Sequence, residues 1–504
     1  MTRALHTFPG GLQLPTGKSL SDDVESLQVP LPDKLIIPLQ QHIGQPAVAC
    51  VAIGDEVLKG QIIARAEGDI SIPVHASSSG RIIDIGPYPI ASPTITEAEC
   101  IVIATDGRDA WAPIAPIGEC ASLDPIVLQQ ALLDAGITGL GGAGFPTHVK
   151  IREGVGNIVD TLIINGVECE PYITCDDRLI QEKAYCVVAG ACMIRRAVQA
   201  RHCVIAVEDD MPEAYEALAA LIDDDIELLR VPTRYPAGGE KQLIQAITGR
   251  EVPSGGSAIE IGVVMQNVAT AAAMYRAVTR GEPVVSRYVT ITGDGVARPR
   301  NLQVLIGTPV RHCLEVCAHH AEQDHDIILG GPMMGIPLHD IDSPVTKTSN
   351  CVLVAKPVER SPEMPCIRCG DCADVCPVRL LPQQLHWFAR SNDQAAALEH
   401  RLFDCIECGC CAYVCPSHIP LVAYYRDAKQ AINEAEQRRE SEDHARMRYH
   451  AHQDRLARRA AEKQQQTTTT RNDNRQADDK RSQIAAAVAR TKARRARNRN
   501  RDNE

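Results

Sequence analysis

The sequence lacks any apolar run of the roughly 18 residues that a membrane-spanning helix requires. Its N-terminal stretch, Met-Thr-Arg-Ala-Leu-His-Thr-Phe-Pro-Gly, also lacks the apolar centre of a secretion signal. These two absences lead us to expect a soluble or peripheral cytoplasmic protein. Disulfides are rare in that reducing compartment, so the 20 cysteines indicate thiol and metal chemistry.

Acids outnumber basic residues outside the end of the chain. The net charge is −12, yet residues 480–504 carry nine lysines and arginines against two acids. That segment contributes seven positive charges, which leaves a net charge of −19 on the rest of the chain. Such an acidic body argues against nucleic acid as a partner. The basic end is suited to contact with an anionic surface.

Eight of the cysteines form two copies of one spacing, C-x2-C-x2-C-x3-C-P. The first copy contains Cys366, Cys369, Cys372 and Cys376, and the second contains Cys405, Cys408, Cys411 and Cys415. In bacterial two-cluster proteins with this spacing, the fourth cysteine of each run binds the other cluster. Three thiolates in a tight loop reach three corners of one cubane, whereas the fourth lies too far along the chain. We therefore predict one [4Fe–4S] cluster on Cys366, Cys369, Cys372 and Cys415, and a second on Cys405, Cys408, Cys411 and Cys376.

Other uses of these cysteines fit the spacing less well. A structural zinc site needs four ligands, usually as two separated C-x2-C pairs, and would leave thiolates over. A disulfide framework needs an oxidising compartment, for which the sequence carries no signal. Cys410 lies inside the second run but out of phase with it, so we expect a small buried side chain and no ligand there.

Turn residues and composition divide the chain into segments of different character. We expect a multidomain α/β protein with an extended arm at 1–34, a β-sandwich at 35–105, an α/β domain at 120–285, a β-grasp domain at 286–356, an all-helical twin-cluster domain at 360–430 and a charged tail at 431–504. From about Asn433 the tail is rich in Gln, Arg, Glu and Ala, and we expect a frayed helix that passes into disorder.

The predictions of the sandwich and of the α/β domain depend on different sequence patterns. Residues 54–63 and 75–80 resemble the lipoyl/biotinyl sandwich, but that family carries its modified lysine in an Asp-Lys pair, and here Ile70 follows Asp69. The fold is therefore expected without swinging-arm chemistry. Between 122 and 285 strand and helix patterns alternate, which predicts a mostly parallel sheet.

A glycine-rich stretch lies early in the α/β domain. It contains Gly139, Gly141, Gly142 and Gly144, followed by Phe145. Glycines at this density let the backbone approach a ligand, and their amides can line a phosphate, although a plain tight turn is an equal alternative. A predicted helix precedes the stretch, so it is not the strand–turn–helix dinucleotide fingerprint.

The stretch, together with Pro146, Thr147 and Lys150, resembles the nucleotide loop of the FMN- and NADH-binding subunit of respiratory complex I. Later segments match that family at Asn165, Glu168, Glu170 and Pro171, and more loosely at Tyr235, Glu240 and Asn267. The resemblance implies bound FMN, with Lys150 pairing with a phosphate and with Glu168 and Glu170 acting near the flavin and nicotinamide. Val167 and Gly239 replace acids of the family pattern, which affects the NADH contacts more than the flavin contacts.

Over residues 1–430 the domain order resembles the C subunit of Rnf-type (Rsx) ion-translocating electron-transport complexes. Residues 8–11 and 38–46 also resemble that family, and the related complex I subunit lacks the twin-cluster domain. The resemblance implies a peripheral subunit on the cytoplasmic face of the inner membrane, with integral membrane and ferredoxin-like subunits as partners and NADH as substrate.

Three functions are consistent with these patterns. The first is an electron-input subunit that passes electrons between NADH, FMN and two [4Fe–4S] clusters, coupled in the whole complex to ion movement. The alternatives are a soluble flavin/iron–sulfur diaphorase subunit and a non-catalytic cluster relay without flavin. A flavin spectrum would separate the first from the relay, and recovery with membranes would argue against the diaphorase.

Overall fold

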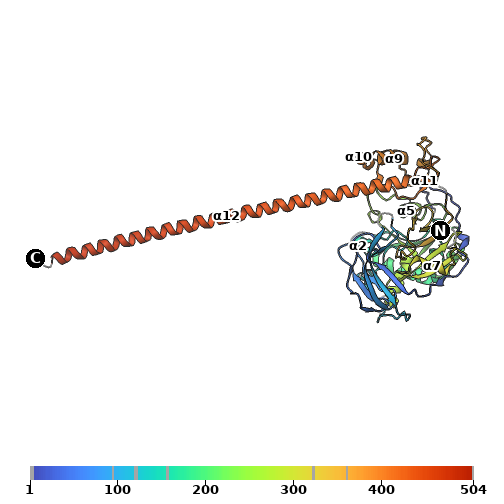
Figure 1. Ribbon diagram of the computed structural model, residues 1–504, viewed down its shortest axis with the longest axis horizontal. Coiled ribbons are helices and arrows are strands. Elements are labelled where there is room, and N and C mark those ends of the chain that lie inside the picture. The colour runs from blue at the N-terminus through green and yellow to red at the C-terminus, as the bar shows by residue number, and fades with distance from the viewer. Residues whose placement is uncertain are drawn as a thin grey trace. The chain divides into compact units, whose positions relative to one another are not determined.

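The computed structural model describes residues 5–92, 96–118, 123–154, 158–320, 324–358 and 361–501 (Figure 1). The ends of the expected arm and tail, residues 1–4 and 502–504, lie outside these ranges. The chain forms two compact units, residues 1–427 and 428–504. In its described residues, the first unit contains four β-sheets and the cysteine runs.

The N-terminal domain is a sandwich of two antiparallel sheets, drawn in blue in Figure 1. One sheet has the order β2 (Lys34–Pro38), β8 (Glu97–Thr105), β7 (Gly80–Pro89) and β4 (Glu56–Val57). The other has the order β3 (Val48–Ala49), β5 (Ile62–Arg65) and β6 (Val74–His75). Leu35, Ile63 and Ile101 are fully buried between them. The expected sandwich is confirmed.

The α/β domain is built on a fully parallel sheet with the strand order β11-β10-β9-β12. The strands are β9 (Thr161–Gly166), β10 (His202–Glu208), β11 (Glu227–Val231) and β12 (Val263–Asn267). Every residue of β9 is buried, as expected for a parallel strand that helices cover on both faces.

Two hydrophobic cores lie on the two faces of this sheet. The larger one packs Leu162 and Ile164 against α1 (Pro125–Asp134), α3 (Cys175–Val198), α4 (Pro212–Ala219) and α6 (Val268–Arg280). The smaller one packs Ile163 against α5 (Glu240–Thr248) and the 3-10 helix η3 (Ala258–Ile261). Successive side chains of β9 point to opposite faces of the sheet, so this strand contributes to both cores.

The β-grasp region contains a six-stranded mixed sheet of order β1-β14-β13-β17-β15-β16 and the helix α7 (Val310–Val316). Its strands are β1 (Leu27–Gln28), β13 (Ser286–Thr292), β14 (Arg300–Leu305), β15 (Asp326–Leu329), β16 (Ile336–Pro337) and β17 (Cys351–Ala355). Strand β1 comes from the expected arm and pairs in parallel with β14.

The described residues of the arm have little regular structure, only β1 and the 3-10 helix η1 (Lys18–Leu20). The arm nevertheless packs against the folded domains. Phe8 is buried in the smaller core of the α/β domain, and Lys18 is buried against Glu208. Prolines and glycines prevent helix or strand over most of the arm, so tertiary contacts alone fix its course.

The cysteine runs lie in a helical region, and no strand occurs in the described residues from 361 to 420. Its helices are α8 (Asp371–Asp374), α9 (Pro382–Ser391), α10 (Gln394–Glu399), η4 (Leu402–Asp404) and α11 (Cys410–Tyr413). The prediction of a helical cluster domain is therefore confirmed.

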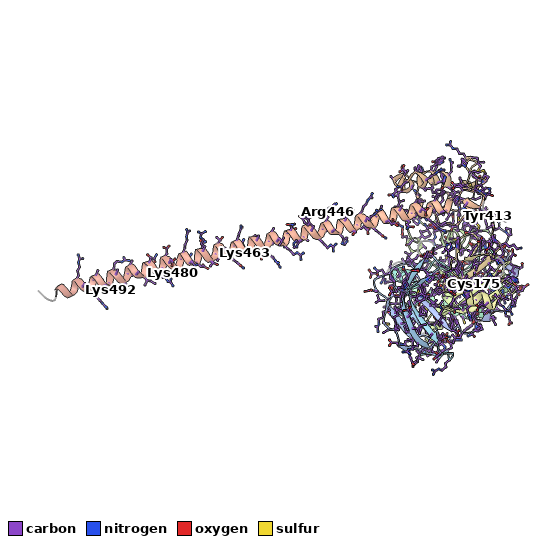
Figure 2. The ribbon with its side chains drawn as sticks, viewed as in Figure 1. Cys175, Tyr413, Arg446, Lys463, Lys480 and Lys492 are labelled. Atoms are coloured by element: carbon purple, nitrogen blue, oxygen red, sulfur yellow. The ribbon has the colours of Figure 1, made fainter. Side chains whose placement is uncertain are left out.

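The tail differs from the prediction. A single helix, α12 (Leu421–Arg501), continues through the segment that was expected to become disordered. The sequence after Pro420 contains neither proline nor glycine, so no residue stops the helix. Arg446, Lys463, Lys480 and Lys492 project from its surface (Figure 2), and the described residues beyond 436 are exposed where burial is defined. No helix within the described ranges is long and apolar enough to cross a membrane.

Candidate functional site

The strand order of the α/β domain reverses at β9, which is the arrangement that forms a ligand-binding crevice in open α/β sheets. The chain enters at β9, moves outward to β10 and β11, and then returns to the other side of β9 with β12. Ligands of open α/β sheets bind beyond the carboxyl ends of the strands where the order reverses in this way. Here that position lies between the ends of β9 and β12.

Two asparagines lie at this position. Asn165 of β9 donates from Nδ2 to the carbonyl of Gly238 at 2.9 Å, and its Oδ1 accepts from the amide of Val167 at 2.9 Å. Asn267 ends β12 and caps α6, because its Oδ1 accepts from the amide of Ala269 at 2.8 Å. The sheet thus brings together two predicted site residues that are 102 positions apart.

The glycine stretch closes a tight loop beside Asn267. The amide of Gly139 donates to the carbonyl of Phe145 at 2.8 Å, which joins the two ends of the loop. Gly141 and Gly142 are exposed at its tip, and a side chain built on Gly141 would lie 3.1 Å from the Asn267 amide nitrogen. Gly142 has φ +103° and faces open space, so its backbone is accessible to a ligand.

Helix α2 (Thr147–Gly154) follows the loop directly and carries Lys150. The Lys150 ammonium lies 2.7 Å from Oε2 of Glu240, at the start of α5, and 3.5 Å from the carbonyl of Met265. Both side chains are partly exposed. Two more of the predicted site residues therefore meet at the same edge of the sheet.

Glu168 is buried at the start of α3. It accepts from the amide of Asp176 at 2.9 Å and from that of Asp177 at 3.2 Å, which satisfies the first donors of the helix. Burial, and after it the neighbouring Asp176 carboxylate, raises the pKa of Glu168 to about 8. The carboxyl group is thus poised to exchange a proton near neutral pH.

Glu170 makes its hydrogen bonds to another element. It accepts from the amides of Met333 and Met334 at 2.7 and 3.0 Å, in the turn between β15 and β16. Burial raises its pKa, and the hydrogen bonds from these two amides oppose that rise. The two predicted catalytic acids therefore make hydrogen bonds to different elements. Glu168 accepts from the first amides of α3, and Glu170 links the α/β domain to the β-grasp sheet.

The cysteines line two separate cavities. Cys366, Cys369, Cys372 and Cys415 line the outer cavity, and Cys376, Cys405, Cys408, Cys410 and Cys411 line the inner cavity. Among the eight cysteines of the two spaced runs, each cavity thus takes three from one run and one from the other. The crossed assignment of these cysteines as cluster ligands stays a prediction.

The backbone repeats between the runs as well. Arg368 and Glu407 both have φ near +60°, and Gly370 and Gly409 follow with φ of +97° and +81°. In each run a one-turn helix follows this glycine, α8 in the first and α11 in the second. Cys410 is buried beside Tyr235 and also lines the inner cavity, and its role as a packing side chain stays a prediction.

Comparison with known proteins matches each of these regions to a family. Residues 6–108 match the RnfC barrel sandwich hybrid domain, residues 132–276 the Nuo51 FMN-binding domain, residues 288–337 the SLBB domain and residues 365–419 the 4Fe-4S dicluster domain. The fold is thus multidomain α/β with these four domains in this order.

Three relatives are named as the C subunit of an ion-translocating oxidoreductase complex. The protein of Pseudomonas aeruginosa is 46% identical over 459 residues, 90% of this chain and 59% of its own length. Those of Salmonella enteritidis and Yersinia pestis are 44% and 46% identical, over 97% and 90% of this chain and 70% and 73% of their own lengths. The chain belongs to this C-subunit family.

A solved structure of an NAD+-reducing [NiFe]-hydrogenase in the H2-reduced state also aligns with the chain. The TM-score is 0.40 at 20% identity, over 57% of this chain and 55% of that one. A likeness of this size carries no argument about function.

In this member of the C-subunit family, the inner cavity adjoins the α/β domain. Tyr235 is 3% exposed and donates from its hydroxyl to the carbonyl of Cys408 at 2.6 Å. Gln242 of α5 reaches the carbonyl of Pro377 at 3.5 Å. Tyr235, expected at the cofactor, therefore directs its hydroxyl towards the cluster domain.

The N-terminal arm also contacts the cluster domain close to its contact with Tyr235. The amide of Gly11 donates to the carbonyl of Val375 at 2.9 Å, and a side chain built on Gly10 would collide with the backbone of Val375 and Cys376. Only glycine at position 10 allows this close approach. The arm thus holds the cluster domain against the α/β domain.

Sequence reasoning missed a buried ion cluster at the same edge of the sheet. The Lys18 ammonium lies 2.7 Å from Glu208, at the end of β10, and 3.0 Å from Asp210. Burial alone would lower the pKa of Lys18, but the nearby carboxylates outweigh it and raise the pKa. No local pattern indicates this pairing, since the partners are 190 residues apart.

Proposed function

We propose that this chain is the electron-input subunit of a membrane-bound ion-translocating complex, and that it passes electrons between NADH, FMN and two [4Fe–4S] clusters. A flavin exchanges two electrons with a hydride donor and single electrons with iron–sulfur clusters, so the bound groups would supply the conversion between the two. The observation that carries the proposal is the hydrogen bond from Tyr235 to Cys408, which joins the flavin-type domain to the wall of the inner cysteine cavity.

The residues at the crevice fit a phosphorylated flavin. The exposed amides around Gly142 offer donors to a phosphate, and Lys150 would supply a positive charge. Asn165 and Asn267 hold the two strand ends that border the crevice. Gly139, Gly144 and Phe145 fix the course of the loop, since Gly144 has φ +64° and packs against Thr348.

The cysteine cavities fit two cubanes, because each brings together four spaced cysteines, three from one run and one from the other, with Cys410 as a fifth cysteine in the inner cavity. Their surroundings differ. Cys376, Cys408 and Cys411 of the inner cavity are buried, whereas Cys369 of the outer cavity is exposed and Ile367 beside it is 68% exposed. We infer that the inner cysteines hold the cluster that exchanges electrons with the flavin, and that the outer ones hold the cluster that faces a partner.

The assignment of NADH rests on the resemblance at Asn165, Glu168 and Glu170. Glu168 has a pKa of about 8 because of burial and Asp176, so it can hold or release a proton near the crevice at neutral pH. Glu170 accepts a hydrogen bond from the amide of Met333, and the carbonyl of Met333 lies next to Gly409 of the inner cavity. Glu170 would therefore help to hold the cluster domain in place beside the α/β domain.

The partners proposed are the integral membrane and ferredoxin-like subunits of the complex, with the chain peripheral on the cytoplasmic face of the inner membrane. The names of the relatives, each the C subunit of a complex, support assembly with other subunits.

Rapid mixing of the cofactor-loaded full-length protein with NADH tests the proposal. We expect loss of flavin absorbance first and cluster reduction second, with NADPH as the matched control donor. A purified protein that contains clusters but no flavin would support the relay instead. A protein that turns over NADH but is never recovered with membranes would support a soluble diaphorase.

A further inference from the structure

A cavity of about 340 Å³ lies apart from the cluster cavities, where three domains meet. Its walls come from the sandwich, from α3 and α6 of the α/β domain, and from β13 and β14 of the β-grasp sheet. The volume falls within the range of small-molecule sites, and junctions between domains are a common place for them.

One wall is apolar and is lined by small side chains. Ala269, Ala272 and Ala273 lie on one side of α6 at helical spacing and line the cavity. Alanine side chains end at Cβ, so this wall leaves room for a planar ring. Trp111, whose backbone pairs with that of Lys59 in the sandwich, also lines the cavity and offers an aromatic surface.

The charged lining is mostly basic. Five basic side chains line the cavity against two acidic ones: Lys59, Lys183, Arg276, Arg280 and Arg287 against Asp109 and Asp176. Lys59 lies over the Trp111 ring at 5.1 Å and pairs with Asp109 at 2.6 Å. Arg276 pairs at 2.7 Å with Glu282, an acid that does not line the cavity.

Lys183 and Arg280 remain the most available of these cations. Both are exposed, and Lys183 has no ion pair or hydrogen-bond partner in the described part of the chain. Arg280 has only a 3.7 Å contact to Glu282 among the described residues and is 57% exposed. Helix α3 also leaves helical geometry at Lys183, with φ −136° and ψ 30°.

The cavity is separate from the flavin crevice, although the two share a wall. Leu140 of the glycine loop and Asp176 line its inner end. Buried Arg287 donates to the Leu140 carbonyl at 3.1 Å, so this wall is built of fixed groups. The crevice residues Lys150 and Asn165 do not line the cavity.

We propose that this cavity binds a small organic anion with a flat apolar body, as a second ligand site of the subunit. The alanine wall and Trp111 would receive the apolar body. Lys183 and Arg280 would receive the negative group at the mouth.

The chain has only two tryptophans, which gives a direct test. In a Trp387→Phe protein loaded with its cofactors, Trp111 is the sole tryptophan. The probe is 1-anilinonaphthalene-8-sulfonate, and the matched uncharged probe is N-phenyl-1-naphthylamine. We expect the sulfonate to quench Trp111 saturably and the uncharged probe to bind more weakly.

Variants then locate the site. Lys183→Ala with Arg280→Ala should weaken sulfonate binding by about fivefold or more, since two partly exposed cations are lost. Arg201→Ala, which removes an exposed cation elsewhere, should leave it unchanged, and so should Lys150→Ala at the crevice. Ala273→Phe should block the cavity and abolish quenching, with circular dichroism and iron content as checks of folding.

Equal binding of the charged and uncharged probes would overturn the proposal. So would an equal loss of sulfonate binding in Arg201→Ala and in the variant that carries both Lys183→Ala and Arg280→Ala. So would unchanged quenching in a folded Ala273→Phe protein. Loss of binding only in Lys150→Ala would place the probe in the flavin crevice and also overturn it. None of these outcomes depends on electron transfer from NADH, so the proposed function is tested separately.

Discussion

Tyr235 and Cys408 are 173 positions apart in the sequence, yet the phenol of Tyr235 donates a 2.6 Å hydrogen bond to the Cys408 carbonyl. The contact is buried and is surrounded by Leu12, Met333 and Val375. The arm, the turn between β15 and β16 and the cluster domain therefore all pack around Tyr235 of the α/β domain.

Tyr235→Phe should remove this hydrogen bond and leave the ring in place. We expect a loss of about 1 kcal/mol in the free energy of unfolding, because the buried carbonyl loses a donor. Flavin reduction by NADH should be retained, while transfer to the clusters slows several-fold. Stopped-flow spectra of both cofactors measure the two steps. Tyr185→Phe, on an exposed ring, is the control. Equal slowing of both steps would show that Tyr235 acts on the flavin instead.

Cys415→Ala should damage the cluster whose other ligands are Cys366, Cys369 and Cys372, because the four thiols line one cavity. The intact protein should hold about eight irons and the variant about four. Iron analysis and electron paramagnetic resonance measure the loss. Cys410→Ala should keep both clusters. Loss of the signal from the inner cavity in Cys415→Ala would show that the crossed grouping does not hold for the ligands.

FMN should be bound without a covalent bond beside the glycine loop. Acid precipitation should release all the flavin into the supernatant, and none of it should contain adenine. Gly142→Ala should weaken flavin binding, because a side chain is strained at φ +103°. Ala143→Ser, in the same exposed tip, is the matched control. Flavin that stays on the pellet would contradict the prediction.

Lys347 should make stability depend on pH. Burial lowers its pKa to about 7, and its ammonium nitrogen donates to the carbonyl of Gly136 at 2.7 Å. Between pH 7 and the ordinary lysine pKa the unfolded chain binds more protons than the folded one, so stability should rise with pH across that range. Lys347→Met should remove this rise and stabilise the protein at pH 7 by on the order of a few kcal/mol. Melting temperatures from pH 6 to 10, followed by tryptophan fluorescence, measure the effect. A parallel slope in both proteins would contradict it.

Truncation after Gln430 should leave iron, flavin and NADH-dependent dye reduction intact. The removed residues lie in the second compact unit and contain no cysteine. Loss of any of the three properties would mean that the tail belongs to the folded enzyme. Membrane recovery at low and high salt tests whether the basic end contributes to attachment, at about 1 kcal/mol for each basic residue near an anionic surface. Recovery equal to that of the full chain would place attachment on the folded domains.

The sequence alone determined the features that depend on short spacings. The cysteine runs are local, because three thiolates must reach one cubane from a single loop, and in the structure three spaced cysteines of each run line one cavity with the fourth cysteine of the other run. The parallel sheet was predicted from the alternation of strand and helix patterns, and the strand order β11-β10-β9-β12 is fully parallel. The glycine loop is local too, since its ends join through Gly139 and Phe145. The tail was the error, since a polar composition indicated disorder while the absence of helix breakers allowed α12 to continue.

Only the tertiary structure decided which side chains face one another. The meeting of Asn165 with Asn267 follows from the reversal of strand order at β9, and the pairing of Lys18 with Glu208 follows from the course of the arm. The Tyr235–Cys408 contact and the basic cavity beside Trp111 arise where separate domains pack together. Such contacts leave no periodic pattern in the sequence, because each one depends on the packing of whole domains and not on the spacing of neighbouring residues.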